Sequence, residues 1–202
     1  MRYMVAILFY FNISHSFTQL HNRLIKFNVG ISNEQIDLKR SINEYNDTSS
    51  KKFEMVSMMP IVSYTHDFIF SNRLSISGKV GFQYLNLFYN NQHFVSSFLF
   101  LSVNPTISIY YQKKFEYYIK LQVGADYWFN KPELLDYQTR KIYPKKVNPI
   151  IGVTLGGFNY YISEKLGLNL ELSIWSPEFL TFGVSYRFLK GKVPTIQQYQ
   201  EY

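Results

Sequence analysis

Hydrophobic and polar residues alternate over two stretches near the end of the chain, residues 166–174 and 180–188. The apolar positions are Leu166, Leu168, Leu170, Leu172 and Ile174, then Leu180, Phe182, Val184, Tyr186 and Phe188. Because successive side chains of a strand point to opposite faces, this period of two predicts β-structure. The short break at Ser176-Pro177-Glu178 joins the two strands into an antiparallel hairpin. Their length suits the roughly 9–11 residues that cross a bilayer at a tilt, rather than the roughly 5–6 of soluble sheets.

The same alternation recurs along the chain and predicts six further strands. They span residues 24–32, 54–65, 74–84, 97–111, 119–127 and 149–161. Segments 112–114 and 163–165 are predicted to be tight turns, and the polar segments 33–52, 86–93 and 130–147 to be loops, with no helical period in any of them. This layout predicts an all-β fold, an eight-stranded antiparallel up-and-down transmembrane β-barrel over residues 22–188, with the tight turns in the periplasm.

The two faces of the predicted strands differ in chemistry. The lipid-facing residues are predicted to include Leu168, Leu170, Leu172, Phe182 and Val184. The opposite face, which would line the lumen, carries Lys26, Lys79, Lys120, Asp126, Glu171 and Arg187. Buried charges persist when they are paired, and eight strands enclose an interior just wide enough for side chains. A lumen charge network is therefore favoured over an ion or proton path, and appreciable conduction of solutes is not expected.

Composition agrees with alternating apolar and polar surroundings. Aromatic residues make up 19% of the chain, yet the mean hydropathy is only −0.14. The net charge is +7, but the lysines and arginines are scattered, so no nucleic-acid partner is predicted. A basic exterior is instead suited to anionic headgroups or surface polysaccharide. Cysteine is absent, which excludes a disulfide framework, a thiol nucleophile and a cysteine metal site.

The two ends of the chain differ from the alternating region. Residues 1–16 have one early positive charge, an apolar run and a small-x-small end, which predict a signal peptide. Residues 189–202 follow the last strand and are predicted to be a C-terminal periplasmic tail.

The alternating region resembles the small outer-membrane β-barrel domains of the OmpA- and OmpX-like group. The segments that carry the resemblance are MPIVSYTHDFIFSNRLSISGKVGFQY and the closing TFGVSYRF. The resemblance covers nearly all of the chain after residue 23 and implies the outer membrane of a Gram-negative bacterium. A soluble lipocalin-like barrel has the same periodicity with its apolar face inward. Strand length, aromatic strand ends and the predicted signal peptide favour the membrane barrel.

Function is less clearly marked than fold. The sequence predicts no catalytic, cofactor-binding or metal-binding residues. A structural or protein-interaction role is favoured, such as an accessory subunit of an envelope complex that contacts outer-membrane lipid and binds its partner through 33–52, 130–147 or 189–202. The alternative is a lipid A-modifying hydrolase, which needs a serine beside a histidine and a carboxylate. Its candidate histidines are His66, expected in a periplasmic turn, and His93, expected in the loop 86–93.

Overall fold

The computed structural model describes residues 22–48, 53–71, 73–89, 92–112, 114–129 and 146–189. The predicted signal peptide, most of the loop 130–147 and nearly all of the predicted tail lie outside these residues. The elements are β1 (Asn22–Ser32), α2 (Asn33–Thr48), β2 (Phe53–Met58), β3 (Ile61–Ile69), β4 (Leu74–Tyr89), β5 (Gln92–Tyr111), β6 (Phe115–Phe129), β7 (Val147–Tyr161), β8 (Leu166–Ile174) and β9 (Glu178–Leu189).

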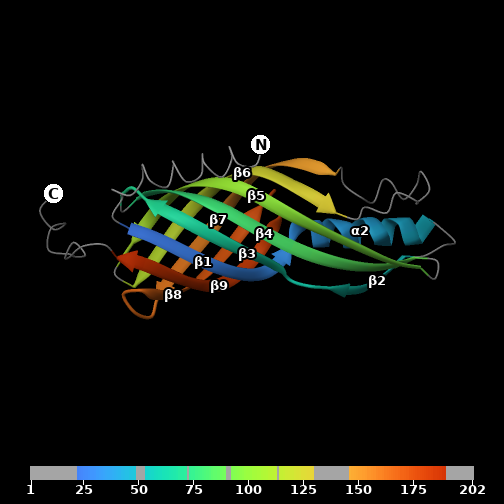
Figure 1. Ribbon diagram of the computed structural model, residues 1–202, viewed down its shortest axis with the longest axis horizontal. Helices are drawn as coiled ribbons and strands as arrows, with labels where there is room; N and C mark the ends of the chain where they lie inside the picture. The colour runs from blue at the N-terminus through green and yellow to red at the C-terminus, as the bar shows by residue number, and fades with distance from the viewer. Residues whose placement is uncertain are drawn as a thin grey trace, which may run out of the picture.

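Eight of the strands form a closed barrel. Around the ring the order is β1, β3, β4, β5, β6, β7, β8 and β9, and β9 pairs with β1 to close it. Every pairing is antiparallel, and apart from the closing β9–β1 pair each barrel strand is followed around the ring by the next barrel strand in sequence (Figure 1). The predicted eight-stranded up-and-down barrel is confirmed.

The second predicted strand, 54–65, is divided in the structure. Met59 and Pro60 separate β2 from β3, and Pro60 has no backbone N–H to continue a ladder. Only β3 belongs to the barrel wall, and it continues to Ile69, so His66 lies in a strand and not in the predicted turn. β2 pairs with the far end of β4, from Phe53 opposite Tyr89 to Met58 opposite Leu85.

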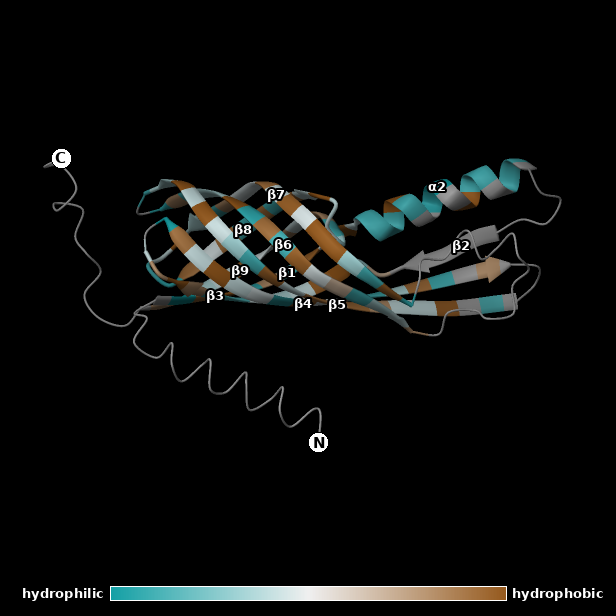
Figure 2. Cartoon of the chain, turned by 90° about the horizontal axis from the view of Figure 1, so that it is seen from above, coloured by the Kyte–Doolittle hydropathy of each residue, from teal (hydrophilic) through white to brown (hydrophobic). Residues whose placement is uncertain are grey.

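The β4–β5 hairpin projects beyond the barrel. The segment 86–93 was expected to be a loop, but β4 continues to Tyr89, which pairs with Gln92 at the start of β5. His93 is therefore in β5. Pairing between β5 and β6 begins only at Ser97 opposite Phe129, so the outer end of the hairpin extends past β6 (Figure 2). The prediction of a loop was wrong because the alternation weakens where the strands leave the wall.

The segment 33–48 is a helix, α2, and the prediction of a loop there was wrong. Ser32 caps it, because the Ser32 hydroxyl accepts a hydrogen bond from the backbone N–H of Gln35 at 2.9 Å. The side chain of Ile42 is buried, and α2 lies beside β2 and the ends of β1 and β9.

Two ends of the barrel can now be distinguished. The turn end holds three short connections, at 70–73, 112–114 and 162–165, together with the start of β1 and the end of β9. The mouth end holds α2, β2, the projecting β4–β5 hairpin and the short connection 175–177. Figure 2 shows α2, β2 and the outer end of the β4–β5 hairpin grouped beyond one rim of the barrel.

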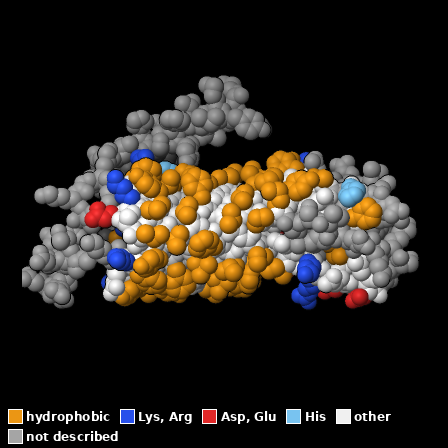
Figure 3. Space-filling model, turned by 90° about the horizontal axis from the view of Figure 1, so that it is seen from below, with side chains coloured by type: hydrophobic (Ala, Val, Ile, Leu, Met, Phe, Trp, Pro, Cys, Tyr) orange, Lys and Arg blue, Asp and Glu red, His pale blue; other side chains and the backbone are white. Residues whose placement is uncertain are grey.

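The outer face of the wall is covered by apolar side chains. Phe27, Leu101, Val123 and Phe182 are exposed on four different strands, while their neighbours Lys26, Ser102, Gln122 and Thr181 are buried in the lumen. Figure 3 shows the apolar side chains as a broad belt across the visible face of the barrel, with charged side chains at its two ends. No helix in the described part of the chain is both long enough and apolar enough to span a membrane.

Candidate functional site

Three lysines from three strands meet one glutamate in the middle of the lumen. The Nζ atoms of Lys79 and Lys120 lie 3.1 Å and 2.6 Å from Oε2 of Glu171, and Nζ of Lys26 lies 3.7 Å from Oε1. All four side chains are buried. Four of the six charged lumen residues named from the sequence therefore form one cluster, which we call the lysine–glutamate cluster.

Two further carboxylates complete this cluster. Asp67 of β3 lies 3.3 Å from Lys26, and Glu178 of β9 forms an ion pair with Lys79 and accepts a hydrogen bond from Ser63 at 2.5 Å. Three positive charges thus face three negative ones, so the buried cluster is electrically balanced. Neither carboxylate was expected in the lumen, because Asp67 follows His66 in the predicted periplasmic turn and Glu178 lies in the predicted break between strands.

Tyr118 of β6 is a polar link within the lysine–glutamate cluster. Its hydroxyl donates a hydrogen bond to Glu171 at 2.6 Å and accepts one from Lys26 at 3.0 Å. The ring passes over Gly157, its cross-strand partner on β7, where any Cβ atom would clash with the ring carbons. A glycine at this position therefore lets the Tyr118 ring lie against the wall and reach Glu171.

Arg187 is buried at the turn end, apart from the lysine–glutamate cluster. Its Cζ atom lies 3.8 Å from the centroid of the Tyr161 ring, a cation–π contact. The Tyr161 hydroxyl donates to Glu116 at 3.2 Å, and Glu116 also accepts from Asn159 at 2.8 Å and from Ser108 at 2.5 Å. These contacts fill the turn end of the lumen with a second polar group.

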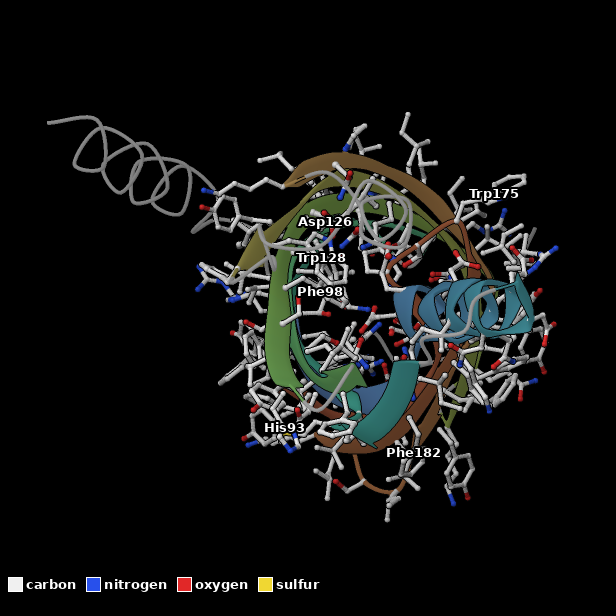
Figure 4. All side chains as sticks on the ribbon, turned by 90° about the vertical axis from the view of Figure 1, so that its right-hand side faces the viewer. His93, Phe98, Asp126, Trp128, Trp175 and Phe182 are labelled. Atoms are coloured by element: carbon white, nitrogen blue, oxygen red, sulfur yellow. The ribbon has the colours of Figure 1, made fainter. Side chains whose placement is uncertain are left out.

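Asp126 lies toward the mouth end, also apart from the cluster. It accepts a hydrogen bond from the Asn148 side chain at 2.7 Å. Beside it the lumen is aromatic, because the rings of Phe98 and Trp128 are buried with centroids 4.9 Å apart. Figure 4 shows Phe98, Asp126 and Trp128 inside the ring, and Trp175 and Phe182 outside it. Side chains therefore fill the lumen at the mouth end, in the middle and at the turn end.

The first turn of α2 carries an acidic side chain near this aromatic region. Burial, together with the nearby carboxylates Asp126 and Asp37, raises the pKa of Glu34 to about 7. The helix start is held to the barrel, since the backbone N–H of Asn33 donates to the carbonyl of Pro177 at 3.0 Å. The Asn33 side chain also donates to the carbonyl of Ser176 at 2.6 Å.

The five residues predicted to face lipid are on the outer face of β8 and β9. Phe182 and Val184 are about half exposed, Leu170 and Leu172 slightly less so, and Leu168 is partly covered. Leu168 pairs with Val184, and Leu170 pairs with Phe182. Cross-strand partners share a face, so these residues form one continuous apolar patch.

The two described histidines lie on strands, and each contacts an aromatic ring. His66 is on the outer face of β3, where its ring stacks on Phe68 with centroids 4.7 Å apart. His93 is exposed and contacts Phe88, 4.9 Å between centroids, in the projecting hairpin. No group of three or more histidine, aspartate or glutamate side chains in the described residues is arranged to hold a metal ion.

Comparison with known proteins shows which solved structures share this fold. No family model and no curated protein matches the sequence. The outer membrane protein OprG from Pseudomonas aeruginosa superposes with a TM-score of 0.52 at 8% identity, over 84% of this chain and 96% of OprG. The chain has the fold of the small outer-membrane β-barrels. The resemblance to the OmpA- and OmpX-like group is thereby confirmed for the fold.

Two further solved structures match less closely. The N-terminal barrel domain of Pseudomonas aeruginosa OprF gives a TM-score of 0.47 at 8% identity, over 84% of this chain and 98% of that domain. The outer membrane protein Ail of Yersinia pestis gives 0.46 at 10% identity, over 83% of this chain and 99% of Ail.

Proposed function

We propose that the protein spans the outer membrane as a barrel that does not conduct solutes, and that it acts as an interaction protein through its mouth end. The apolar belt supports the membrane location, because so large an apolar surface is unfavourable in water and favourable against lipid chains. The shared fold with OprG supports the same location. The turn end then faces the periplasm and the mouth end faces the exterior, the usual arrangement of short turns and longer loops.

The filled lumen supports a role other than transport. The lysine–glutamate cluster occupies the middle of the barrel, and Phe98, Phe100 and Trp128 are fully buried toward the mouth end. Eight strands enclose little more than the volume of such side chains. The parts that distinguish this chain from a bare barrel are therefore the elements outside the wall.

The observation that carries the proposal is the ordered structure beyond the wall. α2, β2 and the outer end of the β4–β5 hairpin form a platform at the mouth. Of these elements, α2 lies within the predicted partner segment 33–52, whereas β2 and the hairpin lie outside it. α2 presents exposed charges on its outer side, including the Arg40–Glu44 ion pair at 3.1 Å. Ordered elements cost conformational entropy, and a passive surface loop does not need them.

Trp175 adds an aromatic anchor beside this platform. It is 77% exposed, and its backbone φ of 56° lies in the left-handed region that a residue with a side chain rarely adopts. Trp175 belongs to the connection 175–177, and hydrogen bonds from Asn33 to the carbonyls of Ser176 and Pro177 attach this connection to the start of α2. Exposed tryptophans are frequent anchors of protein interfaces.

The test is partner recovery from the native membrane. Tagged full-length protein would be purified in mild detergent, and co-purified proteins would be quantified by mass spectrometry. Replacing residues 33–48 by a short Gly-Ser linker is expected to abolish recovery of one stoichiometric partner, and Trp175→Ala to reduce it. Removing residues 190–202 serves as the matched control and is expected to leave recovery unchanged if the platform is the binding surface. Absence of any stoichiometric partner, or its retention by all three variants, would contradict the proposal.

The alternative function, a lipid A-modifying hydrolase, gains no support from the positions of His66 and His93. It retains a direct test. His66→Ala and His93→Ala are expected to leave the acylation pattern of lipid A unchanged, as read by mass spectrometry of lipid extracts. A changed pattern in either variant would favour the enzyme over the interaction protein.

A further inference from the structure

The three short connections at the turn end share one construction. Each ends in a cationic residue directly before a strand: Arg73 before β4, Lys114 before β6 and Lys165 before β8. In each, the backbone carbonyl of the cationic residue accepts a hydrogen bond from the next strand. The donors are the N–H groups of Ser108, Tyr161 and Arg187, at 2.8, 2.8 and 2.7 Å. The same bond therefore fixes the backbone of all three cations.

Two of these turns agree in further detail. In the first, Ser71 Oγ accepts from the backbone N–H groups of Arg73 at 3.2 Å and Leu74 at 3.1 Å. In the third, Ser163 Oγ accepts from those of Lys165 at 3.4 Å and Leu166 at 3.0 Å. A serine two residues before the cation thus locks the turn in both places.

The cationic side chains lie at the edge of the apolar belt. Arg73, Lys114 and Lys165 are exposed, and so are apolar residues near them in sequence. These apolar residues, each within four positions of a cation, are Phe70, Leu74, Tyr110, Ile162 and Leu166. Arg23, at the turn end of β1, lies with its Cζ atom 5.8 Å from the ring centroid of Phe68. Figure 3 shows blue side chains at the end of the belt opposite the mouth.

The charge at this rim has one predominant sign. Glu164 is the one exposed carboxylate among the described residues of the three turns, against the cations Arg73, Lys114 and Lys165. Long cationic side chains at the end of an apolar surface keep their stems on that surface and extend their charged heads to the headgroup level. Anionic phosphates at that depth are the complementary ligand.

We infer that the turn end binds the headgroups of anionic phospholipids through a ring formed by Arg73, Lys114 and Lys165, with Arg23 beside it. The inference rests on the proposed membrane location, which places this rim in the periplasmic leaflet. The ring selects anionic over zwitterionic phospholipid at the barrel perimeter and sets the depth of the barrel in the bilayer. The alternative ligand of this rim is a periplasmic protein. If the rim binds such a protein instead of lipid, the barrel should show no selectivity among lipids.

The test measures lipid selectivity of the full-length protein in vesicles. Spin-labelled phosphatidylglycerol and spin-labelled phosphatidylcholine would be compared in phosphatidylcholine vesicles, and the motionally restricted fraction of each gives a relative association constant. We expect a preference of about fivefold for phosphatidylglycerol. In the variant Arg73→Gln/Lys114→Gln/Lys165→Gln the ratio should fall to about one, which means that the preference is lost. The charge-conserving variant Arg73→Lys/Lys114→Arg/Lys165→Arg should retain the preference.

The matched control removes the same charge from the other end. Lys39→Gln/Arg40→Gln/Lys146→Gln changes three exposed cations at the mouth end and should leave the preference within about twofold of the original. If the glutamine variant does not fold, raising the salt concentration with the original protein should screen the preference away. The inference is overturned if the preference is absent, survives removal of the rim cations, or falls equally in the control. Failure of the protein to insert into any vesicle would instead overturn the proposed membrane location.

Discussion

The barrel and the platform at its mouth are built on different principles. In the barrel, side chains alternate between an apolar outer face and a polar lumen, and the central charges of the lumen are paired with one another. In the platform, α2 has exposed charges on its outer side, and β2 pairs with a single strand of the sheet. The barrel is thus held by buried interactions that tolerate little change. The platform is held by a cap, a few anchoring hydrogen bonds and one buried face.

This difference separates stability from function. A change in the lumen is expected to affect the whole barrel, because three strands supply lysines and three supply carboxylates to one cluster. A change in the platform is expected to affect local order and partner binding while the barrel remains folded. Four substitutions or conditions sharpen this comparison.

The largest effect is expected for Glu171→Gln. It leaves Lys26, Lys79 and Lys120 with only Asp67 and Glu178 to balance them, at a cost of about 3–5 kcal/mol. The measurement is urea unfolding in lipid vesicles, together with the temperature at which the folded form is lost on gels. Glu44→Gln is the matched control on α2, where the exposed pair with Arg40 should contribute less than about 0.5 kcal/mol. Equal effects of the two substitutions would remove the distinction between barrel and platform.

A smaller effect is expected for Gly157→Ala. The new methyl group clashes with the ring of Tyr118 and displaces its hydroxyl from Glu171, which should cost about 1–3 kcal/mol. The same unfolding measurement applies. Gly78→Ala is the control, because a Cβ atom at Gly78 has open space around it. If both variants unfold at the same urea concentration, the account of Tyr118 is wrong.

Ser32→Ala is expected to act where the platform joins the barrel, because the Ser32 hydroxyl caps α2 and also donates a hydrogen bond to Gln83 of β4 at 2.5 Å. Loss of the cap to Gln35 should reduce the stability of α2 by about 1 kcal/mol. Hydrogen exchange of α2 amides should become faster by a corresponding factor, while amides in β5, β6 and β7 should exchange as before. Faster exchange throughout the barrel would mean that α2 and the wall unfold together.

The pH dependence of α2 should follow Glu34. Its pKa in the folded protein is raised to about 7 from an ordinary value of 4.5, so the folded state holds the proton more tightly. The stabilisation of the folded state by protonated Glu34 is therefore fully present below pH 4.5. It is lost as the pH rises toward 7, and stability changes little above that pH. Amide exchange in α2 should accelerate over this pH range after correction for intrinsic rates. Glu34→Gln should remove the dependence, and an unchanged dependence in that variant would assign it to another group.

The barrel could be predicted from sequence because its signal is repeated in every strand. The alternation of Leu168, Leu170 and Leu172 with Asn169 and Glu171 specifies both a strand and its two faces. The six charged lumen residues were found in the same way, and all six are buried. Which of them meet could not be predicted, because contact across a lumen depends on strand stagger rather than on sequence distance.

The errors lie where the local pattern changes. Ser32 and Gln35 have the spacing of a capping box, which was a signal for α2 among polar residues that otherwise resemble a loop. Asp67 was missed because β3 continues beyond the predicted strand end. Tyr118 was missed because the predicted strand began at residue 119, whereas β6 begins at Phe115. These residues are specified by tertiary contacts, which periodicity does not report.

The central claim is that the lumen is closed, so that the protein works through its surface. Conductance of the purified full-length protein in planar lipid bilayers tests it most directly. The account predicts a baseline without stable openings across a range of voltages, because buried side chains occupy the lumen along its length. Large, long-lived openings of the folded, heat-modifiable protein would contradict the account and favour a channel.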